Sequence, residues 1–183
     1  MKKKTDKSSP RNNTLSIHDS GKYDNPNTPL INPIHMTTSF KFETLQEFFD
    51  NFNNEENGYT YTRFDNPSIR QLEARIAALE KGAAGVAFSS GMAAISTVLL
   101  SLLGCKNELI VHQNLYGSTF ALIKELLPQY GIKINIVDLS DLDTLKQAIS
   151  KNTKVIFFET PTNPSLDIID IKRVCALAKK CGV

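Results

Sequence analysis

Apolar positions along the chain alternate between short continuous runs and longer stretches in which they recur every three or four residues. A short apolar run between turn residues is typical of a buried strand, and the longer repeat is typical of one helix face. Strands that alternate with helices favour a mostly parallel sheet, so the pattern predicts an α/β fold with helices flanking that sheet. The expected strands are 86–88, 108–112, 132–137 and 155–158, and the expected helices are 44–52, 67–81, 117–127, 141–149, 168–180 and one from residue 92 onward.

Cap residues and apolar spacing define the boundaries and buried faces of these helices. Asn66 is a good N-cap for the helix 67–81, and Gly82 is expected to end it. In the helix from residue 92 onward, Ile95, Leu99 and Leu102 are expected to lie on one apolar face.

The chain before residue 67 follows a different pattern. Residues 1–13 are polar and basic, and we expect them to be a disordered tail. Residues 14–66 contain too few apolar positions at one period to build a core, so we expect an arm that lies against the next domain or a partner subunit. Residues 67–183 would then form the α/β domain.

The stretch 86–103 predicts a strand, a tight turn and a helix, with Ser90, Gly91 and Met92 at the turn. The first backbone N–H groups of a helix have no partner inside it, and the helix dipole adds positive potential there. A phosphate is a natural occupant of such a site, and Gly91 would let it approach the backbone closely. Small residues at a strand–helix turn also serve close packing alone, so this alternative stays open.

Two further stretches follow expected strands, at the carboxyl edge of the sheet where open α/β folds bind ligands. The first, 113–117, contains Tyr116, which could stack on a flat ring or transfer a proton. The second, 159–164, contains Glu159 and Asn163, and the prolines on both sides of Asn163 stiffen its backbone. A packed tyrosine ring and a rigid connection are the structural alternatives. Together the stretches suggest a site for an aromatic phosphate.

Tyr61 and Arg63 lie just before the helix 67–81. We expect the two residues to alternate along an extended segment, so that both side chains point to one side and could hold a phosphate by charge-assisted hydrogen bonds. A packed tyrosine beside a surface arginine is the alternative.

Composition excludes some classes of protein. Hydrophobic residues make up 41% and charged residues 22% of the 183 positions, as in ordinary globular proteins. The net charge is +2 and the positive charge is concentrated at the N-terminus, so we expect no nucleic-acid partner. No segment has the length of a membrane-spanning helix or the pattern of a secretory signal, so we expect no membrane association.

Cysteine and histidine placement points away from disulfides and metals. Cys105, Cys175 and Cys181 are an odd number without metal-ligand spacing, which suggests reduced thiols in a cytoplasmic protein. The three histidines lie far apart in the sequence, so no metal site is expected.

Four motifs, in this order, resemble those of the pyridoxal-phosphate (PLP) enzymes of cysteine and methionine metabolism. This family includes cystathionine γ-synthases, cystathionine lyases, methionine γ-lyases and homoserine sulfhydrylases. The resemblance begins near residue 14 and implies the large domain of a fold type I enzyme, in a homodimer or homotetramer. The motifs are Tyr-Thr-Arg-Phe-Asp-Asn-Pro at 61–67, Ser-Gly-Met-Ala-Ala at 90–94, Leu-Tyr-Gly at 115–117 and Glu-Thr-Pro-Thr-Asn-Pro at 159–164.

The resemblance implies a role for each motif. The amides of Gly91 and Met92 would bind the cofactor phosphate, and Tyr61 and Arg63 would reach the phosphate of the neighbouring subunit. Tyr116 would be catalytic, stacking on the pyridine ring and taking part in proton transfer or elimination. Asn163 would lie near the ring hydroxyl, with Glu159 supporting the pocket. The expected cofactor-binding residues are Tyr61, Arg63, Ser90, Gly91, Met92, Tyr116, Glu159 and Asn163.

The implied activity is γ-elimination or γ-replacement on cystathionine, methionine or an O-acyl-homoserine, with pyridoxal 5′-phosphate as the electron sink. Ser118 replaces a cysteine found in some methionine γ-lyases, which favours the cystathionine-type enzymes.

The chain departs from the family in length, because family members are about twice as long. The lysine that forms the Schiff base, the aspartate beside the pyridine nitrogen and the substrate-binding arginine are expected after Val183. We therefore expect an N-terminal portion without the C-terminal domain and without activity of its own. The alternative is a non-catalytic remnant that pairs with a full-length paralogue or weakly binds the cofactor phosphate. Lysines expected on polar faces or loops, unsuited to the Schiff base, are Lys81, Lys106, Lys124, Lys151, Lys154, Lys172, Lys179 and Lys180.

Overall fold

The computed structural model describes residue 16 and residues 31–53 and 58–183, so the predicted tail 1–13 lies outside the described residues. The chain forms two compact units, Met1–Ala87 and Phe88–Val183. In the first unit the helices are α2 (Leu45–Asn53) and α3 (Pro67–Glu80). The second unit contains α4 (Gly91–Leu102), β1 (Glu108–His112), α5 (Gly117–Ala121), η1 (Leu122–Leu126), η2 (Leu127–Tyr130), β2 (Lys133–Val137), α6 (Leu142–Ala148), β3 (Thr153–Phe157) and α7 (Ile171–Cys181).

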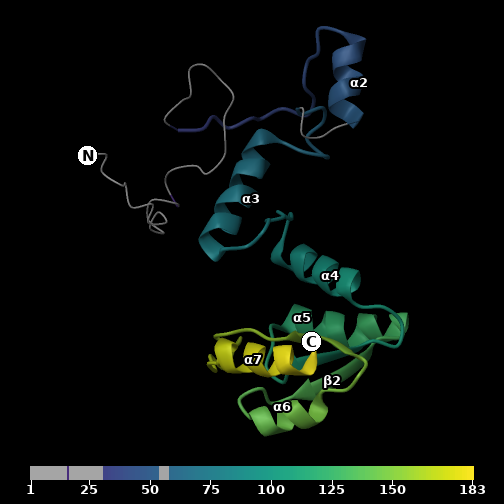
Figure 1. Ribbon diagram of the computed structural model, residues 1–183, viewed down its shortest axis with the longest axis vertical. Helices are drawn as coiled ribbons and strands as arrows, with labels where there is room; N and C mark the ends of the chain where they lie inside the picture. The colour runs from purple at the N-terminus through teal and green to yellow at the C-terminus, as the bar shows by residue number, and fades with distance from the viewer. Residues whose placement is uncertain (1–15, 17–30, 54–57) are drawn as a thin grey trace, which may run out of the picture. The chain divides into compact units, whose positions relative to one another are not determined.

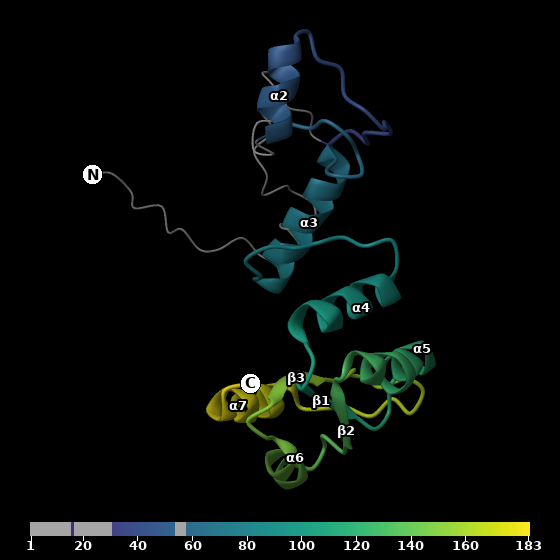
Figure 2. The same ribbon diagram turned by 90° about the vertical axis from the view of Figure 1, so that its right-hand side faces the viewer.

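The second unit is built on a parallel three-stranded sheet in the order β2-β1-β3. Glu108 at the start of β1 pairs with Lys133 of β2 and with Thr153 of β3. Figures 1 and 2 show α5 on one side of this sheet and α6 and α7 on the other. The predicted α/β fold with a mostly parallel sheet flanked by helices is confirmed.

The predicted strand 86–88 is wrong, so the sheet described has three strands and not four. Val86 is 72% exposed and Phe88 39% exposed. A strand is held by ladder hydrogen bonds to a neighbour, and within the described residues no neighbour pairs with this run. Its apolar side chains resemble those of a buried strand, but the boundary between the two units falls between Ala87 and Phe88.

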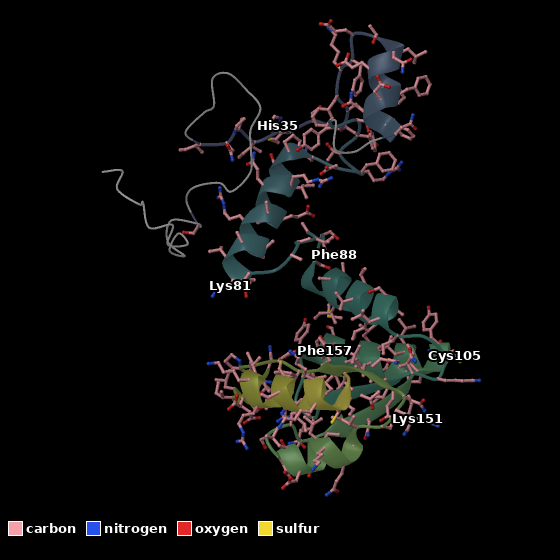
Figure 3. The ribbon with its side chains drawn as sticks, viewed as in Figure 1. His35, Lys81, Phe88, Cys105, Lys151 and Phe157 are labelled. Carbon is pink, nitrogen blue, oxygen red and sulfur yellow. The ribbon has the colours of Figure 1, made fainter. Side chains whose placement is uncertain are left out.

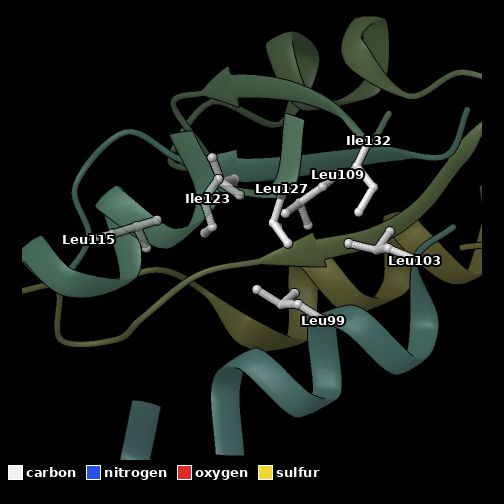
Figure 4. Close-up of a cluster of buried hydrophobic side chains, with 8 residues drawn as sticks. Leu99, Leu103, Leu109, Leu115, Ile123, Leu127 and Ile132 are labelled. Carbon is white, nitrogen blue, oxygen red and sulfur yellow. The ribbon is translucent and has the colours of Figure 1, made fainter. Parts of the chain in front are cut away.

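Each face of the sheet covers a separate apolar core. On one face, α4 and the helical run from α5 to η2 pack on β1, with Leu99, Leu109 and Leu127 fully buried (Figure 4). On the other face, α6 and α7 enclose Ile110 and the neighbouring apolar side chains. The expected face of α4 needs one correction, because Leu102 is 58% exposed and the next residue, Leu103, is buried.

Local signals explain most helix boundaries. Asn66 accepts the Ser68 N–H as the N-cap of α3, as predicted. α3 ends one residue earlier than expected, because Lys81, and not Gly82, takes the left-handed conformation, with φ 56°. The helix expected from residue 168 begins at Ile171, because the Asp170 side chain caps it by accepting the Arg173 N–H.

The first unit contains an aromatic cluster between α2 and the segment before α3. Phe48 contacts Phe42, Phe49 and Phe52, and Phe52 contacts Phe64 edge-on. Half of the Phe52 and Phe64 surface stays exposed, so this cluster is a partly open core.

Across the described residues, no helix is both long and apolar enough to cross a membrane.

Glu108 is the charged group most deeply buried in the sheet, at the amino edge of β1, with 2% exposure. Its carboxylate accepts hydrogen bonds from Lys133 Nζ at 3.0 Å and from Ser150 Oγ at 3.3 Å. Burial disfavours the charged form, but the hydrogen bond and charge of Lys133, helped by Asn135 and Ser150, outweigh it and lower the pKa of Glu108.

The substitution Glu108→Gln is expected to lower the free energy of unfolding by about 1–3 kcal/mol at neutral pH, because it weakens a buried charge-assisted network. A lowered pKa in the folded state stabilises the protein above the ordinary value of 4.5 and this contribution is lost as the pH falls through the lowered pKa. Urea unfolding followed by circular dichroism should therefore show that the difference in unfolding free energy between the unmodified chain and the variant shrinks as the pH falls through the lowered pKa of Glu108. Glu125→Gln, on an exposed face of η1, is the control; an equal effect there would contradict the prediction.

Candidate functional site

The loops after β1 and β3 meet at the carboxyl edge of the sheet, because these strands are parallel neighbours. The backbone N–H of Tyr116 lies 3.1 Å from both carboxylate oxygens of Glu159 and donates to that carboxylate. Asn114 Nδ2 donates to Asp167 Oδ2 at 2.9 Å. The structure therefore brings the predicted residues Tyr116 and Glu159 together, although 43 positions separate them in the sequence.

The start of α4 has two unused donors. Ser90 is its N-cap: its Oγ accepts the Ala93 N–H at 3.1 Å and its backbone carbonyl accepts the Ala94 N–H. The amides of Gly91 and Met92 have no hydrogen-bond partner among the described residues. A Cβ built on Gly91 would meet no atom within 4 Å, so the space beside it is open. Two free amides at the positive end of a helix suit an anion such as a phosphate.

A side-chain contact joins the α4 start to α5. The Thr119 hydroxyl lies 3.5 Å from the Met92 sulfur, and Thr119 is fully buried. The helix α5 begins directly after Tyr116. This contact therefore places the start of α4, with its free amides, next to the helix that follows the tyrosine-bearing loop. The Tyr116 side chain is 46% exposed, which leaves its ring accessible to a ligand.

Asn163 lies in a closed loop that follows β3. Thr160 Oγ1 accepts the Ile169 N–H at 3.1 Å, and Thr162 exchanges backbone and side-chain hydrogen bonds with Asp167. Asn163 itself is exposed, between the cis peptide bonds that precede Pro161 and Pro164. The loop thus presents this amide at the same edge of the sheet as Tyr116.

The predicted extended segment that carries Tyr61 and Arg63 is wrong, although the two side chains are neighbours. Their segment is a turn and not extended, since the Phe64 N–H donates to the Tyr61 carbonyl at 2.9 Å. The Arg63 guanidinium carbon lies 5.2 Å from the Tyr61 ring centroid and 5.3 Å from that of Phe64. Both residues belong to the first unit, and their binding of a phosphate stays a prediction.

Two polar side chains at the carboxyl edge, those of Asn114 and Asp167, were not anticipated from the sequence. Hydrogen bonds from Ser165 and Asn114 lower the pKa of Asp167, and the carboxylate stays ionised. The Ser-x-Asp spacing at 165–167 is a local signal for the hydrogen bond from Ser165. The Asn114–Asp167 bond, in contrast, spans 53 positions. No local pattern predicts such a contact.

A third unanticipated residue is His112, the last residue of β1, which is 2% exposed. Its Nδ1 accepts the Leu139 N–H at 3.1 Å, which ties β1 to the loop after β2. Within the described part of the chain, no group of three or more His, Cys, Asp or Glu side chains is placed to hold a metal ion.

No lysine among the described residues is buried (Lys81 and Lys151 are labelled in Figure 3). A lysine that forms a covalent bond to an aldehyde needs an environment that lowers its pKa. The three cysteines are free and exposed.

The fold and this edge define a class of protein: an α/β protein with a parallel sheet, in which a helix start with two free amides contacts the helix that follows the Tyr116 loop. The model of the family described as "Cys/Met metabolism PLP-dependent enzyme" matches residues 13–183. The chain belongs to this family, and the family depends on pyridoxal phosphate.

Individual relatives agree with the family assignment. The chain is 46% identical to an L-methionine gamma-lyase of Pseudomonas deceptionensis, over 83% of this chain and 38% of the relative. It is 41% identical to the cystathionine beta-lyase MetC of Bacillus subtilis (strain 168), over 92% of this chain and 41% of the relative. The chain thus spans about two fifths of the length of these relatives.

A solved structure from Campylobacter jejuni is also similar, with a TM-score of 0.81 and 35% identity over 94% of this chain and 42% of that one. It contains N′-pyridoxyl-lysine-5′-monophosphate. The expected fold type I architecture and the expected cofactor are therefore both confirmed for the family to which this chain belongs.

The substitution Glu159→Ala is expected to speed hydrogen exchange of the Tyr116 amide about tenfold or more, because a charge-assisted acceptor is lost. Exchange followed by NMR measures the effect directly. Glu125→Ala removes an exposed carboxylate elsewhere and should leave this amide unchanged. An unchanged Tyr116 amide in the Glu159 variant would contradict the assigned hydrogen bond.

Proposed function

We propose that this chain supplies the phosphate-binding helix start and the tyrosine-bearing loop of a PLP-dependent enzyme of sulfur amino-acid metabolism. The observation that carries the proposal is the pair of free amides, Gly91 and Met92, at the start of α4. Tyr116 follows β1 and begins the helix that contacts Met92 through Thr119. The family match and the relatives named above support the same role.

Each residue at the edge has a defined task in this proposal. The bound cofactor supplies an electron sink for bond breaking beside an amino group. Gly91 and Met92 donate hydrogen bonds to its phosphate, while the cap made by Ser90 keeps these two amides at the open end of α4. Tyr116 would contact the cofactor ring and would hold or move a proton at its phenolic oxygen. Glu159 keeps the Tyr116 backbone in place, and Asn163 donates to a ring substituent.

The proposed reaction is γ-elimination or γ-replacement on a sulfur amino acid or an O-acyl-homoserine. Relatives named for methionine gamma-lyase and for cystathionine beta-lyase both match the chain. Ser118, in the first turn of α5 beside Tyr116, is exposed and replaces the cysteine of some methionine γ-lyases, which favours cystathionine-type substrates.

The first unit is proposed to complete the site of a neighbouring subunit in a homodimer or homotetramer. The rings of Tyr61 and Phe64 hold the exposed Arg63 side chain by cation–π contacts. Among the described residues the Arg63 guanidinium has no hydrogen bond or ion pair, so its N–H groups are available for a phosphate.

The exposed lysines support a second candidate, in which these 183 residues bind the phosphate without catalysis. In that case the chain either binds the cofactor phosphate weakly or pairs with a full-length paralogue through the arm 14–66. The two candidates differ in whether the natural reading frame continues beyond Val183 into a lysine-bearing segment.

The substitution Gly91→Pro tests the phosphate site, because it removes one proposed donor while proline is tolerated at the first position of a helix. Ser90 is already extended, with φ −158° and ψ 159°, as a residue before proline prefers. Calorimetry should show affinity for pyridoxal phosphate about tenfold weaker or more, with the melting temperature retained. Pyridoxal, which lacks the phosphate, should bind more weakly than pyridoxal phosphate to the unmodified chain.

The matched control is Ile171→Pro, which places proline at the first position of α7, where Ile171 is half exposed. It should leave the affinity for pyridoxal phosphate unchanged. Equal affinity of the unmodified chain and the Gly91 variant for pyridoxal phosphate would overturn the proposed site.

The chain alone is expected to hold pyridoxal phosphate without a stable covalent bond to a lysine, because the described lysines are exposed. Borohydride treatment followed by peptide mass spectrometry should find only scattered, substoichiometric labelling. Stoichiometric labelling of one lysine would contradict this expectation.

A further inference from the structure

Two hydrogen bonds connect the loop after β1 to the loop after β3, and they lie on both sides of Asn163 in the sequence. Glu159 accepts from the Tyr116 N–H before Asn163, and Asp167 accepts from Asn114 Nδ2 after it. Only the first involves a residue to which a role is already given.

Asp167 makes several hydrogen bonds within its own loop. Its Oδ2 accepts from Ser165 Oγ at 2.6 Å, and its N–H donates to Thr162 Oγ1 at 2.8 Å. The Thr162 N–H in turn donates to the Asp167 carbonyl at 3.0 Å, and Thr162 is fully buried. Hydrogen bonds between Thr162 and Asp167 therefore close the loop that carries Asn163. A displacement of Asp167 is expected to move this loop.

Asn114 lies in the loop after β1, two residues before Tyr116. Its neighbour Leu115 is buried in the core beneath the sheet, so the backbone between Asn114 and Tyr116 is anchored. The Asn114–Asp167 bond thus connects one anchored loop to one closed loop, and each loop carries a proposed ligand-contacting side chain.

We propose that Asn114 and Asp167 form a clamp that positions Tyr116 and Asn163 relative to each other for the bound cofactor. Both are positioning residues, since neither is assigned a contact with cofactor or substrate. This inference rests on the proposed function of the carboxyl edge and adds two residues to it.

An exposed pair of this kind contributes little to global stability, which separates positioning from folding. Asp167 is exposed, and its negative charge at the carboxyl edge of the sheet disfavours an anionic ligand there. Loss of charge alone would strengthen anion binding, whereas loss of the clamp would weaken it. The two effects have opposite signs and can be measured on the same ligand.

The experiment uses the full 183-residue chain with four variants: Asn114→Ala, Asp167→Ala, the two combined, and the exchange Asn114→Asp with Asp167→Asn. The exchange keeps a donor facing an acceptor and reverses only which side supplies each. Calorimetry with pyridoxal phosphate gives the affinity, and the melting temperature reports on folding. Gln129→Ala, which removes an exposed side-chain hydrogen bond of 2.9 Å on η2, is the control.

Each single alanine variant is expected to weaken the affinity about three- to tenfold, with the melting temperature within about 2 °C of the unmodified chain. The combined variant should bind no more weakly than Asp167→Ala, because Asn114 has already lost its acceptor in that variant. The exchange should restore the affinity to within about twofold. Singles that leave the affinity unchanged or raise it, or an exchange no better than the singles, would overturn the clamp.

NMR without ligand separates this result from a failure of the proposed function. Asp167→Ala should shift the Tyr116 amide, Asn114→Ala should shift the Asn163 side-chain amide, and the exchange should return both toward their original positions. If the unmodified chain binds no pyridoxal phosphate, the proposed function fails and these shifts alone decide the clamp. Unmoved signals across the two loops would overturn it.

Discussion

The parallel pairing of β1 with β3 is the constraint on which the rest of the candidate site depends. Val111 pairs with Phe157, so the two strands end at the same level and their loops emerge side by side. Without this register, Tyr116 and Glu159 could not meet, nor could Asn114 and Asp167. Burial of Ile110 on one face and Leu109 on the other holds the pairing, since both side chains are fully enclosed.

The two helix starts near this edge differ in how their first amides are paired. At the start of α5 the Tyr116 N–H already has the Glu159 carboxylate, an internal anion. At the start of α4 the Ser90 cap satisfies Ala93, and the Gly91 and Met92 amides remain free. Donors that are open to an external anion such as a phosphate are therefore present at the start of α4.

Local chemistry explains what the sequence could predict. β1 was predicted with its observed ends, because the continuous apolar run at 109–111 is typical of a strand buried on both faces. Asn66 was predicted as the N-cap of α3 because capping is a local interaction. The parallel sheet followed from the alternation of strand and helix patterns.

Features that depend on distant partners could not be predicted in the same way. The run 86–88 has a strand-like composition, but pairing decides whether it becomes a strand. The cation–π contact of Arg63 with Tyr61 arises from a turn that the alternation of residue types does not show. The Asn114–Asp167 bond needs both loops in place before it can form.

The central claim is that the open donors at the start of α4 bind the phosphate of the cofactor. The most direct measurement is a titration of the isotope-labelled chain with pyridoxal phosphate, followed through its backbone amide signals. The account predicts that Gly91 and Met92 shift most and move downfield, while the capped amides of Ala93 and Ala94 move little. Stationary Gly91 and Met92 signals, with the largest shifts at the start of another helix such as α6, would contradict it.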